Sequence, residues 1–229
     1  MKYRLSLFLG IVSAFLVLAG IYGSFLIAPL IVTPKTPAGA FSQKVFYFHV
    51  PVAETSLIAF LIAAIFAIVF LVTKAQKYDF WSHAAVEIGL LFGFLVEWTG
   101  VLWVRMEWGS WWTWEPRLTT YLVLLLVYAG YFVLRASVDE ESRRARYAAV
   151  YAIMASVNAP LTFFAVRLIP SVHPVVFTSS GARMEPSMLM SFIISMFGMT
   201  GLFVILLLLR SSLEQMREEV RHLKDQLGG

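Results

Sequence analysis

Residues 55–73 read TSLIAFLIAAIFAIVFLVT, and this run carries no charged side chain. Its length matches the about 20 residues that an α-helix needs to cross the hydrocarbon core of a bilayer. The whole chain has the same character: 59% of its 229 residues are hydrophobic, 14% are charged, and the mean hydropathy is +0.77. An ordinary globular chain is about 25% charged. The composition therefore excludes a soluble domain and predicts an all-α polytopic membrane protein.

Six apolar segments of this kind predict six transmembrane helices. The first follows Lys2 and Arg4 as a secretory signal would, but its apolar run is longer than the about 7–15 residues of a signal peptide. We therefore expect a retained span and one transmembrane domain over residues 1–210. The six predicted spans cover residues 5–32, 45–73, 82–106, 118–136, 147–168 and 187–209.

The lysine and arginine residues predict the orientation of the chain in the membrane. Six of the 18 basic residues fall on the side of the first, third and fifth loops, and the other twelve fall on the side of both termini. Because basic loops tend to stay in the cytoplasm, we expect both termini to be cytoplasmic and the loop at residues 107–119 to be periplasmic. The six outer residues are Lys35, Lys44, Arg105, Arg117, Arg167 and Arg183.

The tail after the sixth span, residues 211–229, is polar and has a helical repeat. Its apolar residues alternate at spacings of three and four, which is an a/d pattern. Two heptads do not establish a coiled coil. Two interpretations of this cytoplasmic amphipathic tail helix stay open: a helix that lies on the membrane surface, and a helix that docks a partner or pairs with itself. The repeating residues are Leu213, Met216, Val220, Leu223 and Leu227.

Two histidines lie where the predicted spans meet the outer surface. His49 stands in KVFYFHVP at the start of the second span, and His173 stands in PSVHP after the fifth. Either one alone is compatible with an interfacial histidine that is bonded to a backbone carbonyl. As a pair approaching from separate loops, they could supply both axial ligands of a haem iron.

The run WGSWWTWEPRLT, residues 108–119, holds four of the seven tryptophans: Trp108, Trp111, Trp112 and Trp114. An aromatic belt at the membrane interface is one explanation. A belt, however, spreads its aromatics over many helix ends. The i, i+3, i+4 spacing of Trp108, Trp111 and Trp112 would place three indoles on one face of a helical turn. We therefore favour an aromatic platform for a large planar ligand.

Charged residues complete the candidate site. Outer arginines commonly reach toward lipid headgroups, but a haem also carries two propionates, and arginine binds carboxylates bidentately. Arg117 is the best candidate because it is close to the tryptophans in sequence, although it could instead pair with Glu115. Two intramembrane acids are candidates by default: Glu54 could orient His49 or face the same cavity, and Glu97 could instead bond to Asn158 or to another helix.

Residues 108–119 resemble the WWD signature, W-G-x-x-W-x-W-D-x-R-L-T, of a haem-handling family of cytochrome c maturation, with Glu115 in place of the usual Asp. The motifs around the two outer histidines match the positions of that family's histidines, and the span count matches its six-span CcmC branch. The resemblance covers nearly the whole chain. It implies non-covalent haem b with His49 and His173 as axial ligands and an aromatic platform beneath it, with Glu115 shaping the loop and Arg117 binding a propionate. The implied platform is Trp108, Trp111, Trp112 and Trp114.

The resemblance also implies a location and partners. Members of this family lie among the lipids of the bacterial inner membrane and help to pass haem to a periplasmic haem chaperone, maturation protein E. They associate with an ATP-binding-cassette pair, maturation proteins A and B, and with a small membrane protein D. This chain has no G-x-x-x-x-G-K-[ST] loop, so any ATP hydrolysis must come from a partner. We expect a haem-binding and transfer protein rather than an enzyme, without nucleic-acid partners.

The absence of cysteine limits the chemistry further. It excludes disulfides, thiolate metal ligands and covalent haem attachment through C-x-x-C-H. Two other functions stay open. A b-type haem electron-transfer subunit would hold haem by histidine pairs within its spans, whereas this chain has one pair at the rim. A haem permease would need discontinuous helices and polar groups at the midplane, for which Glu97, Asn158 and Pro160 are the candidates.

Overall fold

The computed structural model describes residues 2–30, 37–171, 173, 177–178, 181–182 and 184–228. Six helical segments in this part of the chain are long and apolar enough to cross a membrane, which confirms the predicted all-α, six-span architecture. In chain order the elements are α1 (Lys2–Tyr22), the π-helix η1 (Gly23–Ile27), α2 (Pro37–Thr73), α3 (Gln76–Trp108), α4 (Pro116–Ala136), α5 (Glu141–Ser156), α6 (Asn158–Leu168), the antiparallel strands β1 (Phe177–Thr178) and β2 (Gly181–Ala182), and α7 (Pro186–Gly228).

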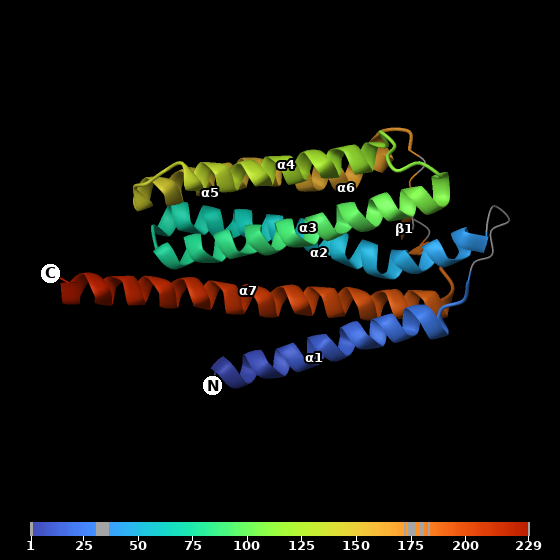
Figure 1. Cartoon of the computed structure of the whole chain (residues 1–229), viewed down its shortest axis with the longest axis horizontal. Helices are drawn as coiled ribbons and strands as arrows, with labels where there is room; N and C mark the ends of the chain where they lie inside the picture. The colour runs from blue at the N-terminus through green and yellow to red at the C-terminus, as the bar shows by residue number, and fades with distance from the viewer. Residues whose placement is uncertain are drawn as a thin grey trace.

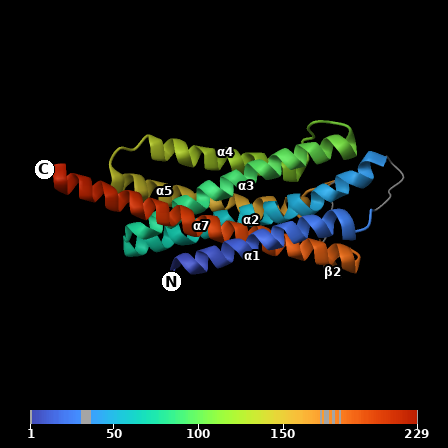
Figure 2. The ribbon, with the colours of Figure 1, turned by 60° about the horizontal axis from the view of Figure 1, so that its bottom comes forward.

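The helices form three layers. Helices α2 and α3 lie in the middle, α4, α5 and α6 cover one side, and α7 and α1 cover the other (Figure 1). Both termini point toward one end of the bundle, which we call the terminal end, while the α3–α4 loop and β1 lie toward the opposite end, the loop end. The rotated view in Figure 2 shows the same two ends, with both termini toward one and the α3–α4 loop at the other. An even number of spans requires this arrangement, and it places the α3–α4 loop and the described residues between α6 and α7 at the same end, as predicted.

The α2–α3 hairpin at the centre of the bundle sets the register of the site. Its turn contains Lys74, whose φ of 57° is left-handed. The two helices approach closely, and the Ser56 hydroxyl donates a hydrogen bond to the carbonyl of Gly89 at 2.8 Å. A Cβ on Gly89 would lie 2.9 Å from a ring carbon of Phe60, so this contact requires glycine. Residues at similar distances before and after Lys74 therefore face each other across the hairpin.

Helix α1 packs against α7 through small residues. A Cβ on Gly198 would lie 2.9 Å from the backbone nitrogen of Val17. Small residues let membrane helices approach closely enough for van der Waals contact between backbones. The other face of α1 leaves Leu5, Phe8 and Phe15 exposed, as expected for a helix at the periphery of a bundle that faces lipid.

Ion pairs fix three helices at the terminal end. Arg135 of α4 donates to both carboxylate oxygens of Asp79 of α3, at 2.8 and 3.0 Å. Asp79 is only 2% exposed. Beside this pair, Arg210 of α7 lies 2.6 Å from the carboxylate of Glu87 of α3. Bidentate arginine–carboxylate pairs of this kind constrain geometry as well as charge, so they hold α3, α4 and α7 in register.

Several helix boundaries differ from the prediction. The first span ends at Ile27 instead of residue 32, and α2 begins at Pro37 instead of residue 45. Helix α7 runs without interruption from Pro186 to Gly228 and extends beyond the other helices at the terminal end (Figure 1). Hydropathy marks only the part of a helix inside hydrocarbon, whereas backbone hydrogen bonding continues into water. A tail collinear with its span favours the docking interpretation over a surface helix.

The fifth span is divided into α5 and α6 at Val157. Pro160 lies in the first turn of α6. In a continuous helix its ring would clash with the carbonyl of Ser156, four residues earlier. The Asn158 amide donates to the carbonyl of Ala155 at 3.4 Å. The break therefore follows from the proline, and it gives the chain one discontinuous span.

Candidate functional site

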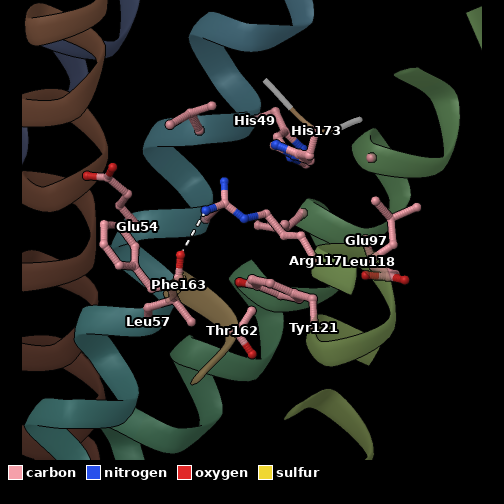
Figure 3. A pocket seen from close by; sticks show the side chains of 14 residues that line it. His49, Glu54, Leu57, Glu97, Arg117, Leu118, Tyr121, Thr162, Phe163 and His173 are labelled. Atoms are coloured by element: carbon pink, nitrogen blue, oxygen red, sulfur yellow. Dashed lines mark hydrogen bonds between the residues drawn. The ribbon is translucent and has the colours of Figure 1, made fainter. Parts of the chain in front are cut away.

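A pocket with a cavity volume of about 70 Å³ lies in the half of the bundle nearest the loop end. It is lined by side chains from α2, α3, α4 and α6 and by His173 from the segment after α6 (Figure 3). The two predicted axial histidines share this pocket, although they come from distant parts of the sequence. Its polar lining residues are His49, Glu54, Glu97, Arg117, Tyr121, Thr162 and His173.

His49 lies inside helix α2, which begins at Pro37. The expectation that both imidazoles approach from loops is therefore wrong for His49. Its side chain is buried, its Nδ1 atom lies 2.8 Å from Oγ1 of Thr99, and its ring meets the indole of Trp103 edge-on with centroids 5.8 Å apart. Thr99 and Trp103 both belong to α3, so the α2–α3 hairpin fixes the position of this imidazole.

His173 lies outside the helices, between α6 and β1. Its backbone N–H donates to Oγ of Ser171 at 3.0 Å. The Ser171 hydroxyl in turn donates to Oε1 of Glu115. His173 is half-buried and lines the same pocket as His49. A chain of two hydrogen bonds therefore joins the segment that carries His173 to the acid of the tryptophan-rich loop.

Glu115 is the N-cap residue of α4. Its Oε2 atom accepts hydrogen bonds from the backbone N–H groups of Arg117 at 2.9 Å and Leu118 at 3.2 Å. Pro116 occupies the first helical position, where its missing N–H has no consequence. The longer arm of glutamate thus reaches the donors that an aspartate usually binds at this position. Glu115 ends the tryptophan-rich loop with one oxygen and binds the His173 segment with the other.

The four tryptophans do not share a helical face. Helix α3 ends at Trp108, and Gly109 follows with a left-handed φ of 73°. The predicted helical turn is wrong, because a glycine in this conformation ends a helix. Trp111 and Trp114 are 59% and 79% exposed, while Trp112 is partly buried and contacts Trp114 edge-on. The pocket that contains both histidines is not lined by any of these four described residues, so they form part of its surroundings at the loop end.

Arg117 reaches into the pocket from the first turn of α4. Its Nη2 atom donates to the carbonyl oxygen of Phe163 on α6 at 3.0 Å (Figure 3). The alternative of a side-chain pair with Glu115 is not what the structure shows, because Glu115 binds the backbone N–H of Arg117 instead. The guanidinium therefore joins α4 to α6 and presents a positive charge inside the pocket.

The other described outer arginines contact residues that are close to them in sequence. Arg105 donates to the carbonyl of Gly109, and its guanidinium lies 5.3 Å from the centre of the Trp111 ring. Arg167 lies 5.0 Å from the centre of the Phe163 ring. Arg183 lies outside the described residues. Arg105 thus supports the tryptophan-rich loop, which leaves Arg117 as the described arginine that lines the pocket.

Two acids and a tyrosine make the inner part of the pocket polar. Glu54 and Glu97 both line it, so Glu54 faces the same cavity as His49. The alternative that Glu97 bonds to Asn158 is not observed, because the Asn158 amide donates to a backbone carbonyl. Oε1 of Glu97 and the hydroxyl of Tyr121 are buried without a hydrogen-bond partner among the described residues. Buried polar atoms normally have partners, so these two atoms fit a pocket that accepts a ligand or water.

The residues fit a haem better than a bare metal ion. The described residues contain no group of three or more His, Cys, Asp or Glu side chains that could hold a metal ion. A haem needs only two protein ligands, because the porphyrin supplies the other four. His49 and His173 can provide these two, Arg117 offers a cation for a propionate, and the remaining lining is largely apolar.

Sequence reasoning did not identify Thr99, Ser171 or Tyr121. A signal for Thr99 was present: it follows Lys74 by as many positions as His49 precedes it, so an antiparallel hairpin turning at Lys74 pairs the two. No comparable signal was present for Ser171, because its contact with Glu115 depends on how two separate loops meet. Tyr121 lies one helical turn after Arg117, and it could have been placed on the same face of α4.

The sequence of the chain was compared with those of known proteins. Residues 1–226 match the model of the CcmC family, described as "Heme exporter protein C". The chain is 35% identical over 183 residues to heme exporter protein C of Bradyrhizobium diazoefficiens, covering 79% of this chain and 70% of that protein. The protein of the same name from Haemophilus influenzae is 31% identical over 185 residues (79% and 74% covered). That from Escherichia coli K12 is 31% identical over 169 residues (74% and 69% covered).

Proposed function

The chain belongs to the heme exporter protein C family, and we propose that it binds haem b between His49 and His173 and delivers it to a periplasmic haem chaperone. Family membership establishes the coarser role, which is haem handling for cytochrome c biogenesis by a multi-pass membrane protein. One observation carries the finer proposal: His49, His173 and Arg117 line a single pocket at the end of the bundle that we expect to be periplasmic.

The side chains of the pocket have different roles in the proposed haem binding. His49 is held by a helix hairpin and His173 by the segment after α6, so the two imidazoles reach the pocket from different elements. Arg117 offers a bidentate donor to a propionate. A bound haem supplies its own iron and conjugated ring, and this chain only holds and presents it. Because the chain has no cysteine, it does not attach haem to itself through thioethers.

The exposed part of the tryptophan-rich loop supports a handover role. Trp111 and Trp114 present large aromatic surfaces at the loop end, beside the segment that carries His173. Exposed aromatic residues are enriched at the centres of protein interfaces. We propose that this loop contacts the recipient, maturation protein E, and that the chain works with maturation proteins A and B and the small membrane protein D. We assign ATP hydrolysis to maturation proteins A and B, because this chain has no phosphate-binding loop.

The test of this proposal is the absorption spectrum of the purified full-length protein. A six-coordinate, low-spin b-type spectrum is expected, with all haem extractable by acidified acetone because none is covalent. The spectrum should change in His49→Ala and in His173→Ala. Unchanged spectra in both variants would overturn the ligand assignment. Transfer is tested by incubation of the haem-loaded protein with purified chaperone and measurement of covalently bound haem on the chaperone.

A haem permease is the second candidate, and one observation favours it. The fifth span is broken between α5 and α6, and discontinuous helices of this kind line substrate sites in transporters. Proteoliposomes with haem on one side only would separate the two functions: a permease equilibrates haem across the bilayer, whereas a haem presenter does not. An electron-transfer subunit gains less support, because His173 lies outside the spans.

A further inference from the structure

Three oxygen atoms of α3 define the surroundings of Nδ1 of His49. Nδ1 of His49 lies 2.8 Å from the hydroxyl oxygen of Thr99. The same oxygen lies 2.7 Å from the carbonyl oxygen of Leu95 and 3.1 Å from that of Val96. The Thr99 hydroxyl is therefore at hydrogen-bond distance from one imidazole nitrogen and two carbonyl oxygens at once.

The Thr99 hydroxyl has one proton, so it can donate to only one of these three partners. A carbonyl oxygen can only accept, and two oxygens 2.7 Å apart with no proton between them would repel each other. The Thr99 proton is thus used by Leu95 or Val96, as is usual for a threonine inside a helix. The lone pairs of the hydroxyl oxygen remain, so the contact with His49 is satisfied only if Nδ1 carries a proton and donates it.

A proton on Nδ1 leaves Nε2 of the neutral ring with a free lone pair. Nε2 is the nitrogen that can then bind an iron, and a histidine ligand normally donates its other N–H to a fixed acceptor. We propose that Thr99 is a positioning residue that holds His49 in the Nδ1–H tautomer, so that Nε2 is presented as the haem ligand. This inference rests on the proposed function, since it names the atom through which His49 binds.

The neighbouring residues of α3 keep the ring in the same orientation. A Cβ on Gly100 would lie 3.3 Å from Cε1 of His49, so the missing side chain leaves room for the ring beside the helix. Trp103 holds the imidazole edge-on from the next turn. Thr99, Gly100 and Trp103 lie at i, i+1 and i+4 on α3. A short stretch of α3 therefore provides the acceptor, the space and the aromatic contact.

The first experiment reads the tautomer directly and needs no haem. Nitrogen-15 NMR of haem-free protein with labelled histidine, with the His49 signals assigned from His49→Ala, should show a protonated Nδ1 and an unprotonated Nε2. Thr99→Ser should keep this pattern, because it keeps the hydroxyl. Thr99→Val has the same shape without the acceptor and should shift the signals toward the Nε2–H form. A wild-type ring protonated on Nε2 would overturn the inference, whatever the protein binds.

The second experiment reads the effect on the ligand. Thr99→Val should weaken haem binding about 10- to 100-fold, as loss of a hydrogen-bonding partner does at other metal-bound histidines. It should also raise the midpoint potential of the haem, because an imidazole without an acceptor is a weaker donor to ferric iron. Thr99→Ser should restore both values. A purely structural role would lower thermal stability and leave the potential unchanged. If the wild-type protein does not bind haem, the proposed function is refuted, but the NMR result on the tautomer of His49 remains valid.

Discussion

The carboxylate of Glu115 accepts a hydrogen bond from the hydroxyl of Ser171, and this contact connects the tryptophan-rich loop to the segment that bears His173. Glu115 also caps α4. A change in the loop, such as the arrival of a recipient protein, therefore has a direct hydrogen-bonded route to the segment of one proposed axial ligand. Among the described residues, the side-chain hydrogen bond and the ring contact of His49 are instead with α3.

We expect Ser171→Ala to disturb His173 without unfolding the loop. It removes one hydrogen bond at each end of the link, and each such bond contributes about 1 kcal/mol. The fraction of high-spin, five-coordinate haem should rise, which absorption and electron paramagnetic resonance spectra measure. Glu115→Asp is the control, because aspartate is the usual acid of the signature and can still cap α4. A Ser171→Ala spectrum identical to wild type would show that the link does not position His173.

The two histidines should differ in their mutational effects. His49 is buried in a helix and is held by Thr99 and Trp103, whereas His173 is held through a backbone hydrogen bond. His173→Ala should therefore retain haem in a five-coordinate form bound by His49, and His49→Ala should lose most of its haem during purification. Haem content per protein, measured by pyridine haemochrome, checks this order. The reverse order would mean that His173 is the anchoring ligand.

Much of the fold can be predicted from local patterns in the sequence. Apolar runs with few charged side chains, such as residues 55–73, identify all six spans. The parity of the loops places His49, His173 and the α3–α4 loop, which carries Trp111, at one end of the bundle. The failures have physical causes. The helical turn over Trp108–Trp112 was inferred from spacing alone, although Gly109 is a helix-ending residue and Glu115-Pro116 is a helix-starting pair. These local signals were present and outweigh the spacing.

Other features depend on tertiary contacts that no local pattern contains. Residues 211–228 form one helix with the sixth span, because nothing in that stretch breaks the backbone hydrogen bonds of α7. The pairing of His49 with Thr99 follows from the turn at Lys74 once the hairpin is known to be antiparallel. The contact of Glu115 with Ser171 has no such geometric rule, because it joins two loops whose paths depend on the whole bundle.

The orientation can be tested with single cysteines, since the natural chain has none. Leu223 in the tail and Trp111 in the α3–α4 loop are 57% and 59% exposed. In intact spheroplasts a membrane-impermeant maleimide should label Trp111→Cys and not Leu223→Cys, and inverted vesicles should give the opposite result. Labelling of both variants from the same side would contradict the six-span topology. A reversed pattern would place the termini in the periplasm.

The buried pair at the terminal end should contribute more to stability than an exposed pair. Arg135→Met leaves the carboxylate of Asp79 buried without its partner, which typically costs about 3–5 kcal/mol. The exposed pair of Arg143 and Glu140 is the control, and Arg143→Met should cost less than about 1 kcal/mol. Thermal unfolding in mild detergent measures both. The double variant Asp79→Leu with Arg135→Met should recover most of the loss, because it removes both charges.

A substitution in the tryptophan-rich loop should impair haem transfer without impairing folding. Trp114 is 79% exposed, so Trp114→Ala should change the free energy of unfolding by less than about 0.5 kcal/mol. If the loop docks the chaperone, the same variant loses an aromatic contact, and such contacts at an interface centre are worth more than about 1 kcal/mol. Covalent haem on the chaperone should therefore fall about fivefold or more, while haem bound to this protein stays constant.

Two further variants make this prediction specific. Trp98 on α3 is 68% exposed but lies outside the loop, so Trp98→Ala is a matched control and should leave transfer unchanged. Trp112 is partly buried against Trp114, so Trp112→Ala should lower both stability and transfer. If Trp114→Ala reduces membrane abundance as much as transfer, the loop supports the fold and does not contact a recipient. If Trp98→Ala impairs transfer equally, the effect comes from the loss of any exposed tryptophan rather than from the loop.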